Sequence, residues 1–215
     1  MLIKICGLRM VEHALAAQAA GADLLGLVFA PSRRQISPAD AALLVEAVRA
    51  APGPQPLIVG LFVNTSPATI RLVADQVGLD ALQLSGDEPV AAADHFDLPI
   101  LKSVRLDGSA AEVAWLARSA PTLAAWPAAP LPLVDAHVPG QYGGSGVIAD
   151  WDRAAILAAQ QPIMLAGGLD PVNVAEAIAK VRPAGVDVSS GVETTGVKDG
   201  TKITAFIRAA RAAAR

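Results

Sequence analysis

Eight short apolar runs, each separated from the next by a turn and a mostly helical stretch, constrain the fold of this 215-residue chain most. The runs are Leu2–Cys6, Leu24–Phe29, Leu57–Val63, Ala81–Leu84, Pro99–Val104, Leu131–Val134, the segment from Ile163 and Gly185–Val188. Continuous apolar runs that alternate with helices indicate parallel strands buried on both faces. Eight such units without a long insertion predict one (β/α)8 (TIM) barrel domain over residues 1–215, with a doubly wound open sheet as the alternative. Against that alternative, the first turn, Cys6-Gly7-Leu8-Arg9, lacks the G-x-G-x-x-G pattern of a dinucleotide site.

Helix signals stand between most of the runs. Ser37 followed by Pro38 predicts a helix with Ser37 as its N-cap and Pro38 at its first position. After the seventh run, Asp170-Pro171 is predicted to open a helix. The segment Pro121–Pro132, which contains Trp126 and four prolines, has no clear period and is interpreted as an irregular link.

Composition and charge limit the classes of partner. Apolar residues make up 53% of the chain, enough for a large core, and the net charge is −3 with dispersed Lys and Arg. This balance gives no reason to expect nucleic acid or an anionic membrane as a partner. No apolar run is long enough to span a bilayer, and the N-terminus lacks a signal-peptide layout. The single cysteine, Cys6, excludes an internal disulfide, and we expect a cytoplasmic protein.

Two neighbouring turns near the end of the chain are rich in small residues. One contains Gly167 and Gly168, and the other contains Ser189, Ser190 and Gly191. Backbone N–H groups in such turns suit an anion, and adjacent strand exits would build one phosphate site from Gly167, Gly168, Ser190 and Gly191. Either turn alone also fits an ordinary strand-to-helix connection, so the two together carry the prediction.

In a barrel the active site is assembled at the C-terminal ends of the strands. Cys6 ends the first run and Asp135 follows the sixth, which makes them a candidate base and a candidate acid. The alternatives are a buried inert thiol and a loop-capping carboxylate. Arg33 and Arg34 follow the second run and are either a solvated loop or a fork for a carboxylate.

Gln83 and Asp187, at or near the ends of the fourth and eighth strands, are predicted as further substrate contacts. No metal site is predicted, because neither cysteine pairs nor a histidine cluster is present. One base, one acid and a phosphate site suggest isomerisation of a sugar phosphate, which needs no cofactor. The alternatives are a phosphosugar lyase or epimerase, for which Lys102 is the only well-placed lysine, and a non-catalytic phosphate-binding barrel, which would need neither Cys6 nor Asp135.

An ordered set of motifs resembles the phosphoribosylanthranilate isomerase family of tryptophan biosynthesis. The motifs are Lys4–Leu8, Ser32–Ile36, Gly60–Asn64, Gln83–Gly86, Asp135 with Tyr142–Gly146, Asp150-Trp151, Ala166–Val174, Val186–Glu193 and Gly196–Asp199. They run in order from the first strand to the last helix. The resemblance implies a (β/α)8 barrel that converts N-(5-phosphoribosyl)anthranilate to 1-(2-carboxyphenylamino)-1-deoxyribulose 5-phosphate by an Amadori rearrangement.

The resemblance also implies residue roles. Cys6 corresponds to the family's general base, Asp135 to its general acid, and Arg34 to the arginine that holds the anthranilate carboxylate. For these roles we expect the pKa of Asp135 to be raised and that of Cys6 to be lowered. The family contains both monomers and homodimers. The sequence departs from the family at three positions, Gln35, Ser85 and Ala149, which replace an aromatic residue, a histidine and a phenylalanine.

Overall fold

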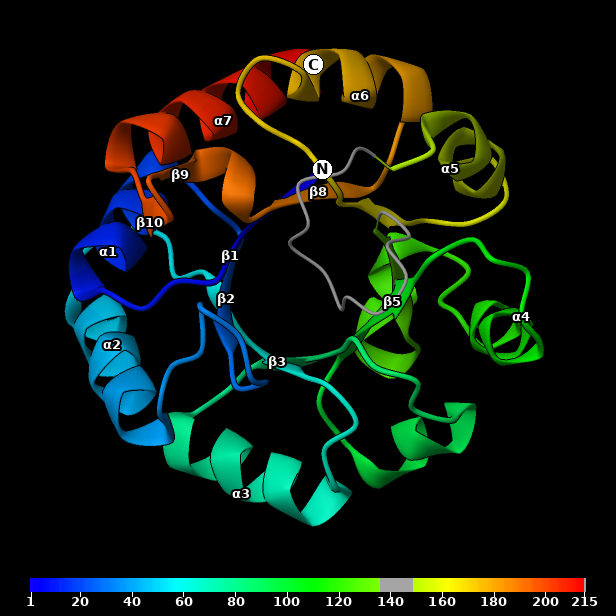
Figure 1. Cartoon of the computed structure of the whole chain (residues 1–215), viewed down its shortest axis with the longest axis horizontal. Helices are drawn as coiled ribbons and strands as arrows, with labels where there is room; N and C mark the ends of the chain where they lie inside the picture. Colours follow the sequence, from blue (N-terminus) through cyan, green and yellow to red (C-terminus); the bar gives the residue numbers. More distant parts are fainter. Residues whose placement is uncertain (136–148, 215) are drawn as a thin grey trace.

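The computed structural model describes residues 1–135 and 149–214. Eight parallel strands form a closed ring in sequence order. Helices surround this ring (Figure 1). The motif Tyr142–Gly146, which follows Asp135 in the sequence, lies outside the described residues. α1 and α7 lie side by side in Figure 1, so the first and last helices complete the outer layer. The (β/α)8 prediction is confirmed, and the open sheet is wrong because β1 pairs with β8.

The barrel strands are β1 Leu2–Cys6, β2 Leu24–Val28, β3 Leu57–Phe62, β4 Ala81–Leu84, β5 Ile100–Val104, β6 Leu131–Val134, β7 Met164–Leu165 and β8 Gly185–Val188. The α-helices are α1 Val11–Ala20, α2 Pro38–Ala50, α3 Pro67–Val77, α4 Ala110–Ala117, α5 Trp151–Ala158, α6 Val174–Val181 and α7 Gly200–Ala213. In the described part of the chain, the 3₁₀ helices η1 Val90–His95, η2 Leu123–Ala128 and η3 Ser190–Val192 lie in the connections, and β9 Glu193–Thr194 pairs with β10 Val197–Lys198. This small hairpin after β8 was not predicted.

Helix starts follow local capping chemistry. The Ser37 hydroxyl accepts a hydrogen bond from Asp40 N–H and Pro38 opens α2, as predicted. The predicted start of α6 at Asp170-Pro171 is wrong, because α6 begins at Val174. Asp170 Oδ1 accepts from the N–H groups of Val172 and Asn173, and this local turn precedes the helix.

Alternate residues of each strand face different cores. Ile3 and Ile5 of β1 pack in the large core between strands and helices. The interior of the barrel holds a second cluster, which includes Leu24, Val59 and Leu131 from the early parts of their strands. Alternation therefore decides which side chains can reach the mouth of the barrel.

The N-terminal end of the barrel is closed by the segment that was interpreted as an irregular link. Its η2 turn places Trp126 in the interior cluster with only 6% exposure. Trp126 Nε1 donates to the carbonyl of Ile100, the first residue of β5, at 3.0 Å. The aromatic side chain thus seals the bottom of the barrel, opposite the end where a site is expected. Among the described residues, no helix is both long and apolar enough to cross a membrane.

Candidate active site

Cys6 lies at the C-terminal end of β1, above a charged pair inside the barrel. Two residues earlier, Lys4 is fully buried, and its Nζ donates to Asp187 Oδ1 of β8 at 3.0 Å. Lys4 and Asp187 are direct partners in the β1–β8 register. Beside them, Gly26 has no side chain, and a Cβ there would lie 2.9 Å from Lys4 Nζ and 3.0 Å from Cys6 Sγ. The glycine therefore provides the space in which the ammonium and the thiol meet.

Cys6 is 5% exposed, and burial raises the pKa of its thiol. The Lys4 ammonium opposes this rise, the Asp187 carboxylate adds to it, and Lys198 gives a weaker opposing attraction. The expectation of a lowered Cys6 pKa is wrong, because the buried thiolate loses more hydration than the two lysines compensate.

Asp135 follows β6 directly, and its N–H donates to the carbonyl of Val104 at the end of β5 at 3.0 Å. Leu131 and Leu133 of β6 belong to the interior cluster, whereas Val134 belongs to the core between strands and helices. Alternation therefore directs the Asp135 side chain to the interior at the mouth. Because β7 and β8 lie between β6 and β1 in the ring, Asp135 and Cys6 approach the mouth from different sides.

The two small-residue turns touch each other. Gly167 and Gly168, after β7, have φ of 82° and 63°, values that favour glycine. A Cβ on Gly191, after β8, would collide with the carbonyl of Leu169, so only glycine allows this close approach of the two loops. Ser190 opens η3 in the same loop, and the N–H groups of Ser190 and Gly191 precede the hydrogen bond from Val192 N–H to the Ser189 carbonyl that closes this single turn. The predicted phosphate-binding residues are therefore brought together at one edge of the mouth.

Arg34 is held by a carboxylate that was given no role from the sequence. Its Nε donates to Glu193 Oε1 at 2.6 Å and its Nη2 to Oε2 at 3.1 Å. Arg33, which is more exposed, also donates to Oε2 at 2.7 Å. A guanidinium has five N–H donors, so the two bonds to Glu193 orient Arg34 and leave donors for a second carboxylate.

Lys198 of β10 connects this pair to the first strand. Its Nζ donates to Glu193 Oε1 and to the carbonyl of Ser189, both at 2.8 Å. The Ser189 hydroxyl in turn donates to the Cys6 carbonyl at 3.2 Å. The partially desolvated Glu193 has its pKa lowered to about 2 by hydrogen bonds from Arg34 and Lys198, which outweigh desolvation. Burial lowers the pKa of Lys198, against the attraction of Glu193.

Gln83 of β4 reaches the interior beside two hydroxyl groups. Its Nε2 donates to Ser85 Oγ at 3.0 Å, and Ser85 Oγ lies 2.8 Å from Ser103 Oγ. Gln83 Oε1 is buried and accepts no hydrogen bond in the described part of the chain. Ser85, which stands where the family often has histidine, thus pairs its hydroxyl group with that of Ser103.

Lys102 does not face the mouth. Its Nζ donates to the Gly86 carbonyl at 2.6 Å and to Glu88 Oε2 at 2.7 Å, and it lies 5.4 Å from the ring centre of Trp115 in α4. The side chain therefore points toward the helix layer, which removes the lysine on which the lyase alternative depends. Within residues 1–135 and 149–214, no group of three or more metal-ligating side chains is placed to hold a metal ion.

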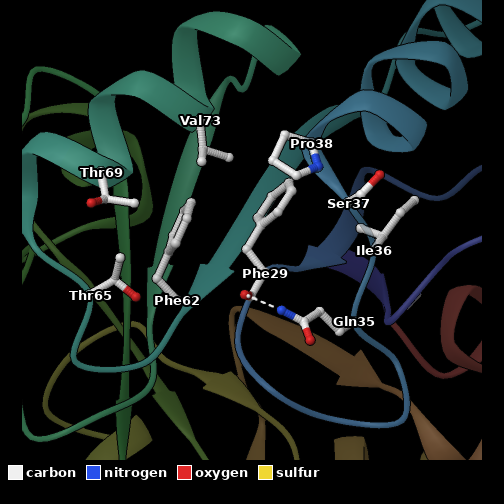
Figure 2. Close-up of a pocket in the computed structure, with 9 residues that line it drawn as sticks. All are labelled: Phe29, Gln35, Ile36, Ser37, Pro38, Phe62, Thr65, Thr69 and Val73. Atoms are coloured by element: carbon white, nitrogen blue, oxygen red, sulfur yellow. Dashed lines mark hydrogen bonds between the residues drawn. The ribbon is translucent and has the colours of Figure 1, made fainter.

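A cavity of about 470 Å³ lies on the helix side of β2 and β3, between α2 and α3 (Figure 2). Phe29 and Phe62 stack in it with ring centres 5.2 Å apart. Gln35, one of the departures from the family, donates from its Nε2 to the Phe29 carbonyl at 3.1 Å. None of the predicted site residues lines this cavity, so it is separate from the barrel mouth.

Comparisons with known proteins agree on one family. Residues 3–209 match the family model described as N-(5'-phosphoribosyl)anthranilate (PRA) isomerase. The N-(5'-phosphoribosyl)anthranilate isomerase of Roseiflexus sp. (strain RS-1) is 57% identical over 217 residues, covering 99% of both chains.

Two solved structures are similar over nearly the whole chain. A monomeric form of the dimeric enzyme from Thermotoga maritima is 34% identical with a TM-score of 0.80, covering 99% of this chain and all of that one. A phosphoribosylanthranilate isomerase in complex with reduced 1-(o-carboxyphenylamino)-1-deoxyribulose 5-phosphate is 35% identical with a TM-score of 0.79 and the same coverage. The chain therefore belongs to the N-(5'-phosphoribosyl)anthranilate isomerase family and is an aldose–ketose isomerase of tryptophan biosynthesis.

Proposed function

We propose that Cys6 is the general base and Asp135 the general acid of the Amadori rearrangement in this enzyme. Asp135 protonates the ring oxygen of the phosphoribosyl group, and the ring opens to an iminium. The Cys6 thiolate then takes the proton from C2, which gives an enolamine that tautomerises to the ketone. One observation carries this proposal. Cys6 ends β1 and Asp135 follows β6, and both occupy inward-facing positions on different sides of the barrel mouth.

The substrate of this chain is a small phosphosugar joined to anthranilate, in line with the ligand of the similar solved complex. We assign its phosphate to the N–H groups of Gly167, Gly168, Ser190 and Gly191. The touching loops and the first turn of η3 support this assignment.

Arg34 is the proposed partner of the anthranilate carboxylate. Glu193 fixes one edge of its guanidinium, which supports binding of the carboxylate at the other edge. Gln83 and Asp187 are proposed contacts lower in the site, where the buried Gln83 Oε1 is an acceptor for a sugar hydroxyl.

We infer that the enzyme acts in the cytoplasm as a monomer or a homodimer. The one cysteine is compatible with a reducing compartment. Sedimentation equilibrium distinguishes the two oligomeric states.

The acid and base assignment is tested by following the loss of phosphoribosylanthranilate fluorescence with wild type, Cys6→Ser and Asp135→Asn. We expect each substitution to reduce kcat by about 10²–10⁴-fold, because each removes one proton-transfer group. The matched control is Gln35→Asn, outside the mouth, with kcat close to wild type. Wild-type rates in both Cys6→Ser and Asp135→Asn would overturn the assignment.

A further inference from the structure

Lys4 is a charged side chain that the acid–base assignment leaves without a role. It lies two residues before Cys6 on β1, so both side chains share the inner face of the barrel. Lys4 is 0% exposed. Burial of an ammonium is strongly unfavourable unless nearby charges compensate it, so the position of Lys4 inside the barrel requires a compensating partner.

Asp187 supplies the first compensating charge. Its Oδ1 accepts from Lys4 Nζ at 3.0 Å across the β1–β8 pairing, and Asp187 is itself only 7% exposed. An ammonium has three N–H donors, and Asp187 fixes where the head group sits. The carboxylate thus anchors Lys4 within the barrel interior.

Cys6 supplies the second partner. The bare Cα of Gly26 lets Lys4 Nζ and Cys6 Sγ border the same small space. Burial lowers the pKa of Lys4, but Asp187 and then Cys6 raise it, and the net change is a rise. The other cation that acts on Cys6, Lys198, is bonded to Glu193 and Ser189, and its attraction for the Cys6 thiolate is weaker than that of Lys4. Lys4 is therefore the better-placed counter-charge for a thiolate.

We propose that Lys4 is a positioning residue for the general base: its ammonium, anchored by Asp187, is the counter-charge that stabilises the Cys6 thiolate. This inference rests on the proposed role of Cys6 as the base. Lys4 acts through Cys6 and transfers no proton, whereas Asp187 sets the place of Lys4 and competes with the thiolate for its charge.

The single cysteine of the chain allows a direct test. Thiolate absorbance at 240 nm is titrated in wild type, Lys4→Met and Asp187→Asn, with Cys6→Ala as the spectral blank. Lys4→Met removes the cation and should raise the Cys6 pKa by about one unit or more. Asp187→Asn keeps an acceptor for Lys4 but removes the opposing charge, so the Cys6 pKa should fall.

Lys102→Met is the matched control, because it also removes a buried lysine with a carboxylate partner, but on the helix side of β5. It should leave the Cys6 titration unchanged. Opposite shifts in Lys4→Met and Asp187→Asn, with none in Lys102→Met, support the inference. If Lys4→Met or Asp187→Asn leaves the titration unmoved, or if both shift it in one direction, the inference is overturned. Should Lys4→Met fail to fold, Lys4→Gln takes its place in the comparison with Asp187→Asn, under the same criterion.

Activity separates this inference from the proposed function. In Lys4→Met, a Cys6 pKa higher by about one unit should lower kcat/KM near pH 7 by about tenfold, and the activity should recover as pH rises, because the thiolate fraction recovers. A loss that is equal at every pH would contradict the inference. A Cys6→Ala enzyme with wild-type kcat would instead overturn the role of Cys6, whatever the titrations show.

Discussion

The guanidinium of Arg34 and the carboxylate of Glu193 form a two-point fork, with Nε 2.6 Å from Oε1 and Nη2 3.1 Å from Oε2. The fork joins the loop after β2 to the strand that follows η3, so residues from opposite ends of the chain set the direction of one cation. Lys198 shares the same carboxylate. Loss of Glu193 should therefore disturb both stability and substrate binding.

Glu193→Gln should make the free energy of unfolding less dependent on pH in the acidic range. The pKa of Glu193 is held at about 2, below the ordinary 4.5, so its ion pairs stabilise the fold fully above about pH 4.5 and are lost as pH falls toward 2. Urea unfolding at pH 7, 5 and 3 should show about 3–5 kcal/mol lower stability at pH 7 and a shallower decline than wild type. The control is Glu176→Gln on the exposed face of α6, with a wild-type slope. An unchanged slope in Glu193→Gln would contradict the prediction.

Arg34→Met should weaken substrate binding much more than Arg33→Met. A hydrogen-bonded charge pair with the anthranilate carboxylate contributes about 1.5–3 kcal/mol, which corresponds to roughly a tenfold to hundredfold rise in KM. Arg33 is more than half exposed, and we expect its substitution to change KM less than about threefold.

An aniline analogue of the product, which lacks the carboxylate, sharpens the comparison. Calorimetry should show that Arg34→Met binds this analogue as tightly as wild type does. Without a carboxylate, the analogue gives Arg34 no partner in the wild-type complex, so the substitution removes no interaction. Equal losses of affinity for the carboxylate and aniline compounds would show that Arg34 acts elsewhere.

Gly26→Ala should reduce catalysis by crowding the lysine and the cysteine. The added methyl group would lie 2.9 Å from Lys4 Nζ and 3.0 Å from Cys6 Sγ, so one of them must move. Overpacking of this kind costs about 1–3 kcal/mol, and misplacement of a base should lower kcat by about tenfold or more. Gly200→Ala is the control, since its methyl group would meet Ala16 at an ordinary 3.7 Å. A folded Gly26→Ala enzyme with wild-type kcat would contradict this prediction.

Trp126→Ala should lower stability without affecting the chemistry. Trp126 seals the N-terminal end of the barrel and donates to the Ile100 carbonyl, and removal of such a side chain costs about 3–5 kcal/mol. Urea unfolding should show this loss, whereas kcat and KM of the folded enzyme at 25 °C should stay within about twofold of wild type. A large fall in kcat would mean that the two ends of the barrel are coupled.

The barrel could be predicted because its signal is local and repeated. The bounds of β4, β6 and β8 match the apolar runs, and the cap of α2 follows from Ser37-Pro38. The start of α6 was missed because the turn at Asp170 resembles a helix cap in sequence. The burial of Trp126 at the N-terminal end depends on the assembled barrel, and no periodic pattern in the surrounding sequence predicts it.

The site was only partly predictable, because local sequence signals do not reveal contacts between residues far apart in the chain. Strand ends pointed to Cys6 and Asp135, and glycine pairs pointed to the touching loops. The Lys4–Asp187 pair and the role of Glu193 depend on partners more than 150 residues away. One signal was available: a lysine two residues before Cys6, on a strand buried on both faces, has to be inside the barrel.

The pairing of Lys4 with Asp187 spans 183 positions of the chain. Because synthesis runs from the N-terminus to the C-terminus, Lys4 is made well before Asp187. A nascent chain that lacks β8 therefore carries a lysine that belongs in the interior but has no counter-charge to accompany it there. Closure of the ring supplies that charge and completes the surroundings of Cys6 in a single step, so a growing polypeptide should acquire the isomerase activity only when β8, the strand that closes the barrel against β1, has docked.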